Sequence, residues 1–226
     1  MGAAISEVLP YAVGVAISPV PIIAVILVLL SARARVNGPA FLVGWIVGVG
    51  VVSIVVYLVA DASDTSDSGS GASDTSFWIK LILGVLLVLL AVRNRRKEGA
   101  SNGQSAPPKW MASIDTLTPA VAGGLALLLS GLNPKNLALS LAAGGSLAQA
   151  GASGGEATVG LIVYIVVASL SIGVPVVFYL VGGDRAATVL DGWKTWLSAY
   201  NAAVMAVLFL VFGVVLFSQG LRGLTA

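Results

Sequence analysis

The sequence predicts an all-α polytopic membrane protein whose six transmembrane helices form two inverted three-helix repeats, with proline-broken first and fourth helices. Three observations lead to this fold class: composition, the lengths of the apolar runs, and the places of the prolines. The 226 residues are 58% hydrophobic and 10% charged, with a mean hydropathy of +0.99. Such a chain cannot cover a soluble globule with polar surface, so we expect it to lie in a membrane.

Composition also restricts the chemistry. Cysteine and histidine are both absent, which excludes thiol catalysis, disulfides and zinc sites and removes the usual neutral-pH general base. We therefore expect no enzyme activity, no cofactor and no metal. The formal charge of +2 indicates no nucleic-acid partner. The N-terminus enters an apolar run without a preceding basic segment, so we interpret this run as the first span rather than a removable signal.

Most of the apolar runs are near the roughly 20 residues that a spanning helix requires. They cover residues 8–32, 39–60, 77–92, 117–149, 158–182 and 200–219. We divide the chain into a first repeat (1–92, with a flexible acidic loop at 61–76), a basic cytoplasmic linker (93–116) and a second repeat (117–226).

The fourth run is too long for one upright helix, since about 33 residues would extend about 50 Å across a core of about 30 Å. Pro134 disfavours a helix at Asn133, so we expect two half-helices there. The run is either a broken, tilted span or a re-entrant hairpin that turns at Asn133-Pro134. We favour spanning, because the first run, broken at Pro19 and Pro21, has a natural spanning length.

The basic residues predict the orientation. If every run crosses once, one side collects Arg33, Arg35, residues 93–97, Lys109, Arg185 and Lys194. That side should be cytoplasmic, which places both termini, the acidic loop and Glu156 outside the plasma membrane. Lys80 and Arg222 would extend to the outer interface. If both proline-containing runs were hairpins, the Glu156 loop would be cytoplasmic instead.

The two halves resemble each other in order. Each opens with a proline-broken span and closes with a similar run, residues 83–87 and 212–216. Because three spans are an odd number, the second repeat should be inverted, and the broken helices of both halves should meet near the midplane. Helix-packing positions are predicted at Gly44, Gly48, Gly123, Gly124, Gly144 and Gly145, and such small-residue faces are compatible with a homodimer.

The predicted substrate site lies where the breaks meet. Lys135 falls near the middle of the fourth run, where a lone cation costs about 2.5–3.5 kcal/mol or more. With Asn133, Pro134 and Asn136 it opens a half-helix, whose free N–H groups and positive dipole end suit an anion. No acid lies within an apolar run. We therefore expect an anionic substrate to be the counter-charge, and Lys135→Met to leave the fold intact.

Other interpretations of these residues remain open. Lys135 would be purely structural if it reached an interface or paired with Glu7 or Asp115, at the ends of their runs. Ser18, Pro19 and Pro21 are predicted to form an unwound loop facing the same cavity, although prolines of this kind also serve as plain kinks. Asn133 suits an N-cap as well as a ligand contact.

The segments Ser18-Pro19-Val20-Pro21-Ile22, Gly44-Trp45-Ile46-Val47-Gly48 and Asn133-Pro134-Lys135-Asn136 together resemble the GAP family. These are the glycopeptidolipid- and sulfolipid-addressing proteins, a branch of the LysE-type exporter superfamily. The resemblance implies a six-span plasma-membrane protein that moves anionic lipids or glycolipids of the cell envelope outward, alongside larger lipid exporters.

Two other functions remain in competition with lipid export. One is export of small amino acids or other solutes, although Ser-Pro-Val-Pro departs from the Pro-Gly-Pro of amino-acid exporters. The other is a non-transporting accessory subunit of a larger lipid exporter. Activity of the purified protein in liposomes would separate the accessory role from transport.

Overall fold

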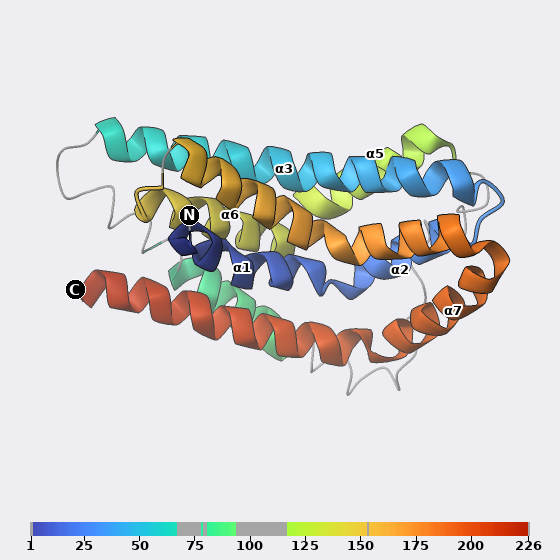
Figure 1. Ribbon diagram of the computed structural model, residues 1–226. Coiled ribbons are helices and arrows are strands. Elements are labelled where there is room, and N and C mark those ends of the chain that lie inside the picture. Colours follow the sequence, from blue (N-terminus) through green and yellow to red (C-terminus); the bar gives the residue numbers. More distant parts are fainter. Residues whose placement is uncertain (1, 67–77, 79–80, 94–116, 153, 226) are drawn as a thin grey trace.

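The computed structural model describes residues 2–66, 78, 81–93, 117–152 and 154–225. These residues form helices and short connections, with no strand among them. Lys80, Lys109, Asp115 and nearly all of the predicted basic linker lie outside the described residues, as does most of the predicted acidic loop. Figure 1 shows the helices running back and forth along one long axis.

The first run is broken as predicted. It forms α1 (Gly2–Ala16) and α2 (Pro19–Leu29), whose axes differ by 56°. Ser18 is the N-cap residue of α2 in an extended conformation (φ −116°, ψ 102°), and Pro19 follows at the first helical position, where a missing N–H costs nothing. The bend is too small for a hairpin, and Figure 1 shows α2 continuing onward from α1.

The second run forms one uninterrupted helix, α3 (Ala34–Ser66). It begins before and ends after the predicted run of 39–60, so the prediction that a loop starts at residue 61 is wrong. Residues 61–66 are polar, but a helix already formed extends cheaply, because each further residue adds a hydrogen bond without a new nucleation step. The third run is described from residue 81 as the apolar helix Leu81–Arg93.

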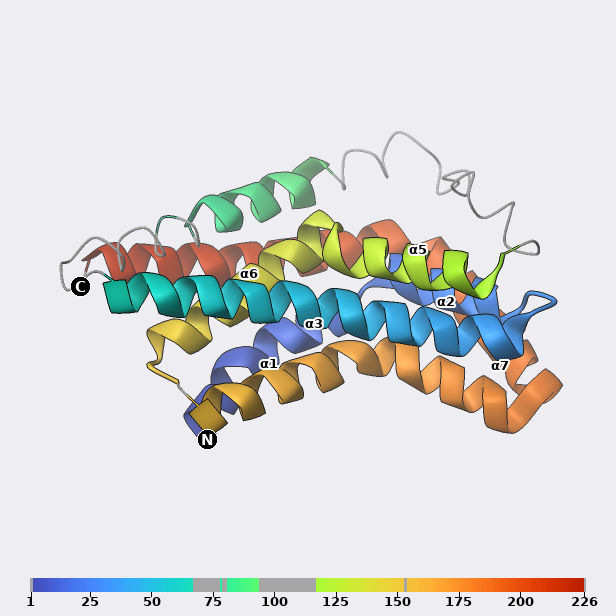
Figure 2. The same ribbon diagram turned by 90° about the horizontal axis from the view of Figure 1, so that it is seen from above.

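The fourth run is also broken as predicted, into α5 (Pro119–Gly131) and α6 (Pro134–Gln149). Thr118 caps α5, its hydroxyl accepting from the amide of Val121, and Asn133 caps α6. In both Figure 1 and Figure 2, α6 continues in the direction of α5 rather than returning beside it. The fourth run therefore does not form a re-entrant hairpin.

The last two runs form α7 (Gly154–Thr225), which consists of two helices joined across a kink at Gly183. Gly183 has φ 54° and ψ −130°, a backbone conformation that residues other than glycine rarely adopt. The chain turns back there (Figure 1). Residues 184–199, which we placed between spans, are helical too, so the second part of α7 begins well before the predicted run of 200–219.

Two stretches are long and apolar enough to cross a membrane, Ala34–Asp61 and Gly154–Ser218, and the bent pair α1 and α2 makes a third if it counts as one span. A straight 65-residue helix would be about 98 Å long, about three times the hydrocarbon thickness of a bilayer. The kink at Gly183 divides this stretch into two shorter helices. The described chain is thus an all-helical membrane protein.

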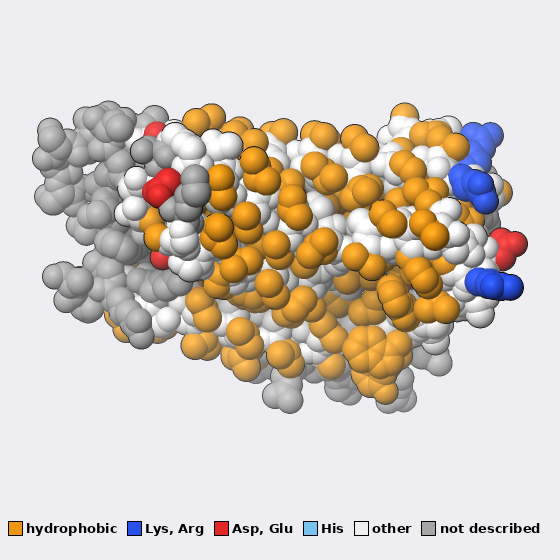
Figure 3. All heavy atoms as spheres, in the orientation of Figure 1, with side chains coloured by type: hydrophobic (Ala, Val, Ile, Leu, Met, Phe, Trp, Pro, Cys, Tyr) orange, Lys and Arg blue, Asp and Glu red, His pale blue; other side chains and the backbone are white. Residues whose placement is uncertain are grey.

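The two halves of the chain are interlocked. Helix α3 of the first half packs along α5 and α6 of the second, while α1 and α2 pack along α7. One apolar core contains residues from all these helices, with Trp45, Tyr11 and Tyr164 among its largest members. Figure 3 shows apolar side chains covering the flank of the bundle, with Lys and Arg gathered at one end. We call this the basic end.

Glycines set the closest helix approaches. A Cβ added to Gly44 would lie 2.1 Å from the carbonyl oxygen of Gly123, so α3 and α5 are in backbone contact there. Gly84 and Gly213 meet reciprocally: a Cβ on the first would lie 2.8 Å from Gly213 O, and one on the second 3.0 Å from Gly84 O. These two glycines occupy matching places in the predicted repeats, so matching positions of the two halves touch each other.

Candidate functional site

The two proline breaks are joined by Lys135. Its ammonium donates to the carbonyl oxygens of Gly14 at 2.7 Å and Ile17 at 3.3 Å. Both acceptors lie at the end of α1, whereas Lys135 lies in the first turn of α6. The lysine is only 1% exposed. The two breaks face each other as predicted, but they are in direct contact rather than on opposite sides of the central cavity that we expected.

The carbonyls need this donor because the sequence around them removes their usual partners. In a continuous helix Ile17 O would accept from residue 21, but Pro21 has no N–H. Gly14 O would accept from the amide of Ser18, which bonds Ala16 O instead at 2.9 Å. A carbonyl left unpaired in the interior costs about 1–3 kcal/mol. Lys135 therefore caps the end of α1 from the other half of the chain.

Asn136 and Asn133 form hydrogen bonds with backbone groups at the second break, as Lys135 does at the first. Asn136 Nδ2 donates to Leu129 O at 3.2 Å, close to the end of α5. Asn133 Oδ1 accepts from the amide of Lys135 at 3.0 Å and caps α6. Pro134, at the first helical position, needs no partner for its nitrogen. Each polar side chain of the Asn-Pro-Lys-Asn segment thus forms a hydrogen bond with a backbone group at one of the two breaks.

Two polar atoms at the breaks have no protein partner. Ser18 is 1% exposed and Asn136 is 0% exposed, yet Ser18 Oγ and Asn136 Oδ1 make no hydrogen bond. Ser18 also fails to use its hydroxyl as an N-cap, although it stands in the N-cap position. Buried polar atoms without a partner are rare in proteins, and they mark places where a ligand or water completes the structure. Both atoms belong to residues of the predicted site.

The site is closed in this structure. Gly14 lacks a side chain, and a Cβ there would lie 2.5 Å from the ring of Phe212 and 2.8 Å from Leu139. Phe212 and Leu139 thus pack directly on the residue whose carbonyl binds Lys135. Because Lys135 itself is buried, a ligand can reach its ammonium only after the packing around the junction opens.

Beyond Lys135, α6 carries further buried hydroxyls. Ser140 Oγ and Tyr164 OH are 2.8 Å apart, and Ser146 Oγ donates to Tyr11 OH at 3.4 Å. These pairs join α6 to α7 and to α1. Hydroxyl pairs between helices hold membrane bundles together. They make α6 the most polar helix of the described interior.

The sequence predicted the members of this site but not the lysine's partners. No acidic partner was expected, and the prediction of a lysine without a partner in the protein is wrong. The acceptors are backbone carbonyls of Gly14 and Ile17, which no motif marks. The signal was present at Pro21, because a proline always releases the carbonyl four residues before it. Among the described residues no Asp, Glu, His or Cys cluster could hold a metal.

Comparison with known proteins identifies a family. A family model described as Sap, sulfolipid-1-addressing protein, matches residues 8–222, nearly the whole chain. The match includes both proline breaks, Lys135, and the contact between Gly84 and Gly213. No curated protein and no solved structure matches the chain.

Proposed function

The chain belongs to the sulfolipid-1-addressing protein family, and from this premise we propose that it moves an anionic lipid of the cell envelope outward across the plasma membrane. The headgroup binds where the two broken helices meet. Lys135 supplies the positive charge, and Ser18 and Asn136 supply the free hydroxyl and amide oxygen. The substrate class is a lipid with a sulfate or other oxyanion next to free hydroxyl groups.

One observation carries this proposal, the charge balance around Lys135. The ammonium is held by two neutral carbonyls, and within the described residues no carboxylate forms an ion pair with it. Carbonyls satisfy the hydrogen-bonding capacity of an ammonium but leave its charge uncompensated. In a membrane interior such charges mark substrate pathways. An anionic headgroup would provide the missing charge.

We also propose the six-span topology with two inverted repeats. The alternating course of the helices in Figure 1 supports it, as does the reciprocal contact of Gly84 with Gly213. The interlocked packing supports it too, because the broken run of each half lies against the long helices of the other. Broken helices that meet across two such repeats form the substrate sites of many secondary transporters.

Single cysteines test the proposed sidedness, since the chain has none of its own. Exposed positions are available at both ends of the bundle: Ser6 and Thr158 at one end, Ala32 and Thr188 at the basic end. Cysteines at Ser6 and Thr158 should react with an impermeant thiol reagent in intact cells. Those at Ala32 and Thr188 should react only after permeabilisation. Labelling of Ala32→Cys in intact cells would show that the orientation is the reverse of the proposed one. Opposite results at Ser6 and Thr158 would show that the first and fourth runs do not both span the membrane.

Ligand-dependent thermal stability tests the substrate class. Sulfated galactosylceramide and galactosylceramide differ only by the sulfate, so they form a matched pair of probes. A lipid that binds only the folded protein should raise the melting temperature by about 5–10 °C at a concentration near 100 times its Kd. We expect this rise with the sulfated lipid and little change with the other. Equal effects of the two lipids would show that the protein does not recognise the anion.

The competing functions give different outcomes in liposomes that contain only the purified protein. A lipid transporter should move the sulfated lipid between leaflets without further proteins. An exporter of amino acids or other solutes should instead release a trapped solute. An accessory subunit would do neither, although it could still bind the lipid and show the thermal shift.

A further inference from the structure

The second part of α7 is longer than a membrane crossing requires. Residues 184–225 would form about 63 Å of helix, roughly twice the hydrocarbon thickness of a bilayer. The apolar run of 200–219 is sufficient to cross by itself. Residues 184–200 are therefore additional, and they follow the kink at Gly183 at the basic end of the bundle (Figure 1).

This segment has three distinct faces. Ala186 and Leu190 are 1% and 0% exposed and pack against the bundle. A second face carries a stripe of large apolar and aromatic side chains at steps of four, three and four residues, which places them in one line along a helix. These are Val189, Trp193, Trp196 and Tyr200, with exposures of 44%, 44%, 57% and 52%. The third face is polar and exposed, and includes Thr188, Asp191 and Thr195.

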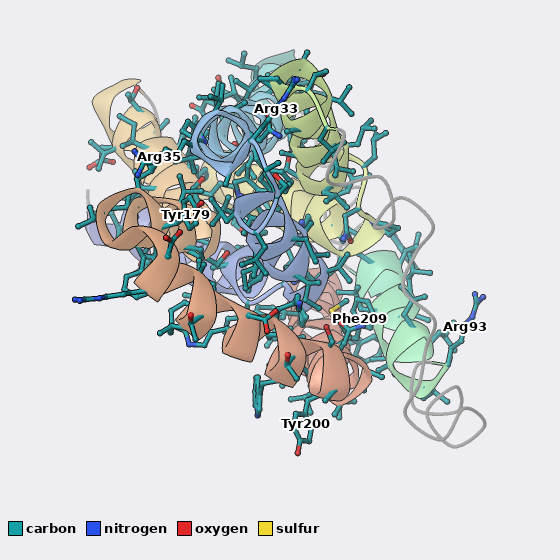
Figure 4. The ribbon with its side chains drawn as sticks, turned by 90° about the vertical axis from the view of Figure 1, so that its right-hand side faces the viewer. Arg33, Arg35, Arg93, Tyr179, Tyr200 and Phe209 are labelled. Atoms are coloured by element: carbon teal, nitrogen blue, oxygen red, sulfur yellow. The ribbon has the colours of Figure 1, made fainter. Side chains whose placement is uncertain are left out.

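Aromatic residues dominate the exposed stripe. Trp193 stacks on Phe178, with ring centroids 6.1 Å apart, and Trp196 packs against Tyr200 at 5.3 Å. Figure 4, seen from the basic end, shows Tyr200 pointing away from the bundle. Trp and Tyr have apolar rings and a polar atom that can donate a hydrogen bond, and they concentrate at the boundary between headgroups and acyl chains. The stripe has the chemistry of that boundary.

The charges of the segment cancel. It contains two acids, Asp184 and Asp191, and two bases, Arg185 and Lys194. Lys194 forms an ion pair with Asp191. A helix held by anionic lipids would instead carry a surplus of Lys and Arg on its polar face. Attraction of this helix to a membrane must therefore come from its aromatic stripe.

We propose that residues 184–200 form an interfacial helix that lies in the headgroup layer at the basic end. The stripe of Val189, Trp193, Trp196 and Tyr200 faces the acyl chains, and the polar face is in contact with water. The partner is the lipid surface itself, bound through aromatic side chains and independent of lipid charge. This helix leads directly into the one that carries Phe212, which packs on Gly14 at the first break.

Neighbouring positions on different faces provide a matched test. Thr188 and Val189 are adjacent and both exposed, so a nitroxide label on a single cysteine at each should differ only in the face it reports. The protein is placed in phosphatidylcholine vesicles. At Val189→Cys the label should be reached by oxygen, which concentrates in the bilayer, severalfold better than by a water-soluble nickel complex. At Thr188→Cys the preference should reverse.

Two further measurements separate this proposal from its rivals. Adding phosphatidylglycerol should leave the accessibility at Val189→Cys unchanged, whereas a shift that depends on the anionic lipid would overturn the aromatic basis. Replacing Trp193→Ser and Trp196→Ser in the Val189→Cys background should expose the label to nickel severalfold more. Equal nickel access at both positions would place the helix in water and refute the proposal. Exclusion of both agents from Val189→Cys would show that another protein surface covers the stripe, and would refute it too.

Discussion

Replacing Lys135 with Met should abolish outward movement of the sulfated lipid, down to the rate of protein-free liposomes, and should remove the sulfate-dependent rise in melting temperature. The ammonium is the one charge that we find at the junction of the breaks among the described residues. An arginine should restore only part of the activity, because its planar fork is larger and presents its donors differently. The measurements are lipid movement in liposomes and thermal unfolding with each probe lipid.

The structure also changes the expected cost of this replacement. Met leaves Gly14 O and Ile17 O without their donor, at about 1–3 kcal/mol for each buried group. The removal of a buried charge offsets part of this loss. We therefore expect a lower melting temperature, whereas the sequence predicted only that the fold would remain intact.

Ser18→Ala separates binding from this structural role. Its hydroxyl has no partner, so the replacement should leave the melting temperature of the empty protein nearly unchanged while it weakens the effect of the sulfated lipid. If Lys135→Met and Ser18→Ala both retained full sulfate-dependent stabilisation, the junction would be only a structural cap, and the headgroup would have to bind elsewhere.

Gly44→Ala should be the most damaging conservative replacement in the bundle. The added methyl group would lie 2.1 Å from Gly123 O and 2.7 Å from Gly123 C. These are backbone atoms that cannot rotate away, so α3 and α5 must separate along their contact. We expect a loss at or above the ~3 kcal/mol upper end of typical overpacking costs. Thermal unfolding in detergent measures it.

Gly124→Ala is the matched control for this prediction. It lies next to Gly123 on α5, but a Cβ there has nothing within 4 Å, so the prediction of a helix-packing position at Gly124 is wrong. Alanine favours a helix over glycine by up to about 1 kcal/mol, so this variant should be as stable as the parent or slightly more stable. A Gly44→Ala protein that unfolded at the same temperature as Gly124→Ala would contradict the backbone contact between α3 and α5.

The parts of the fold that sequence reasoning predicted follow from local chemistry. Pro19 and Pro134 cannot donate to a helix, and both breaks lie where they were expected. Asn133 caps its helix because the position before a helical proline favours such a residue. Gly44 and Gly123 are helix-packing positions as predicted, because residues without side chains allow backbones to approach, although the sequence did not predict that these two meet.

The features that the sequence did not predict depend on contacts between residues far apart in the chain or lie in segments of mixed composition. Lys135 binds carbonyls that lie 121 and 118 residues earlier, and no local pattern identifies a backbone acceptor. Residues 184–200 mix charged, small and aromatic residues, so their pattern did not indicate a helix with one face, at Ala186 and Leu190, packed against the bundle. The end of α3 was missed because Ser, Asp and Thr indicate a loop when judged by type alone.

The distance along the chain between Lys135 and Gly14 also affects how the protein is made. At about 5–20 residues per second, a ribosome needs roughly 6–24 s to add the 121 residues that separate the two. Until Lys135 has been added, the carbonyls at the end of α1 lack this donor, and α7, against which α1 packs, has not been synthesised. The first half should therefore assemble stably only after the second half has been translated.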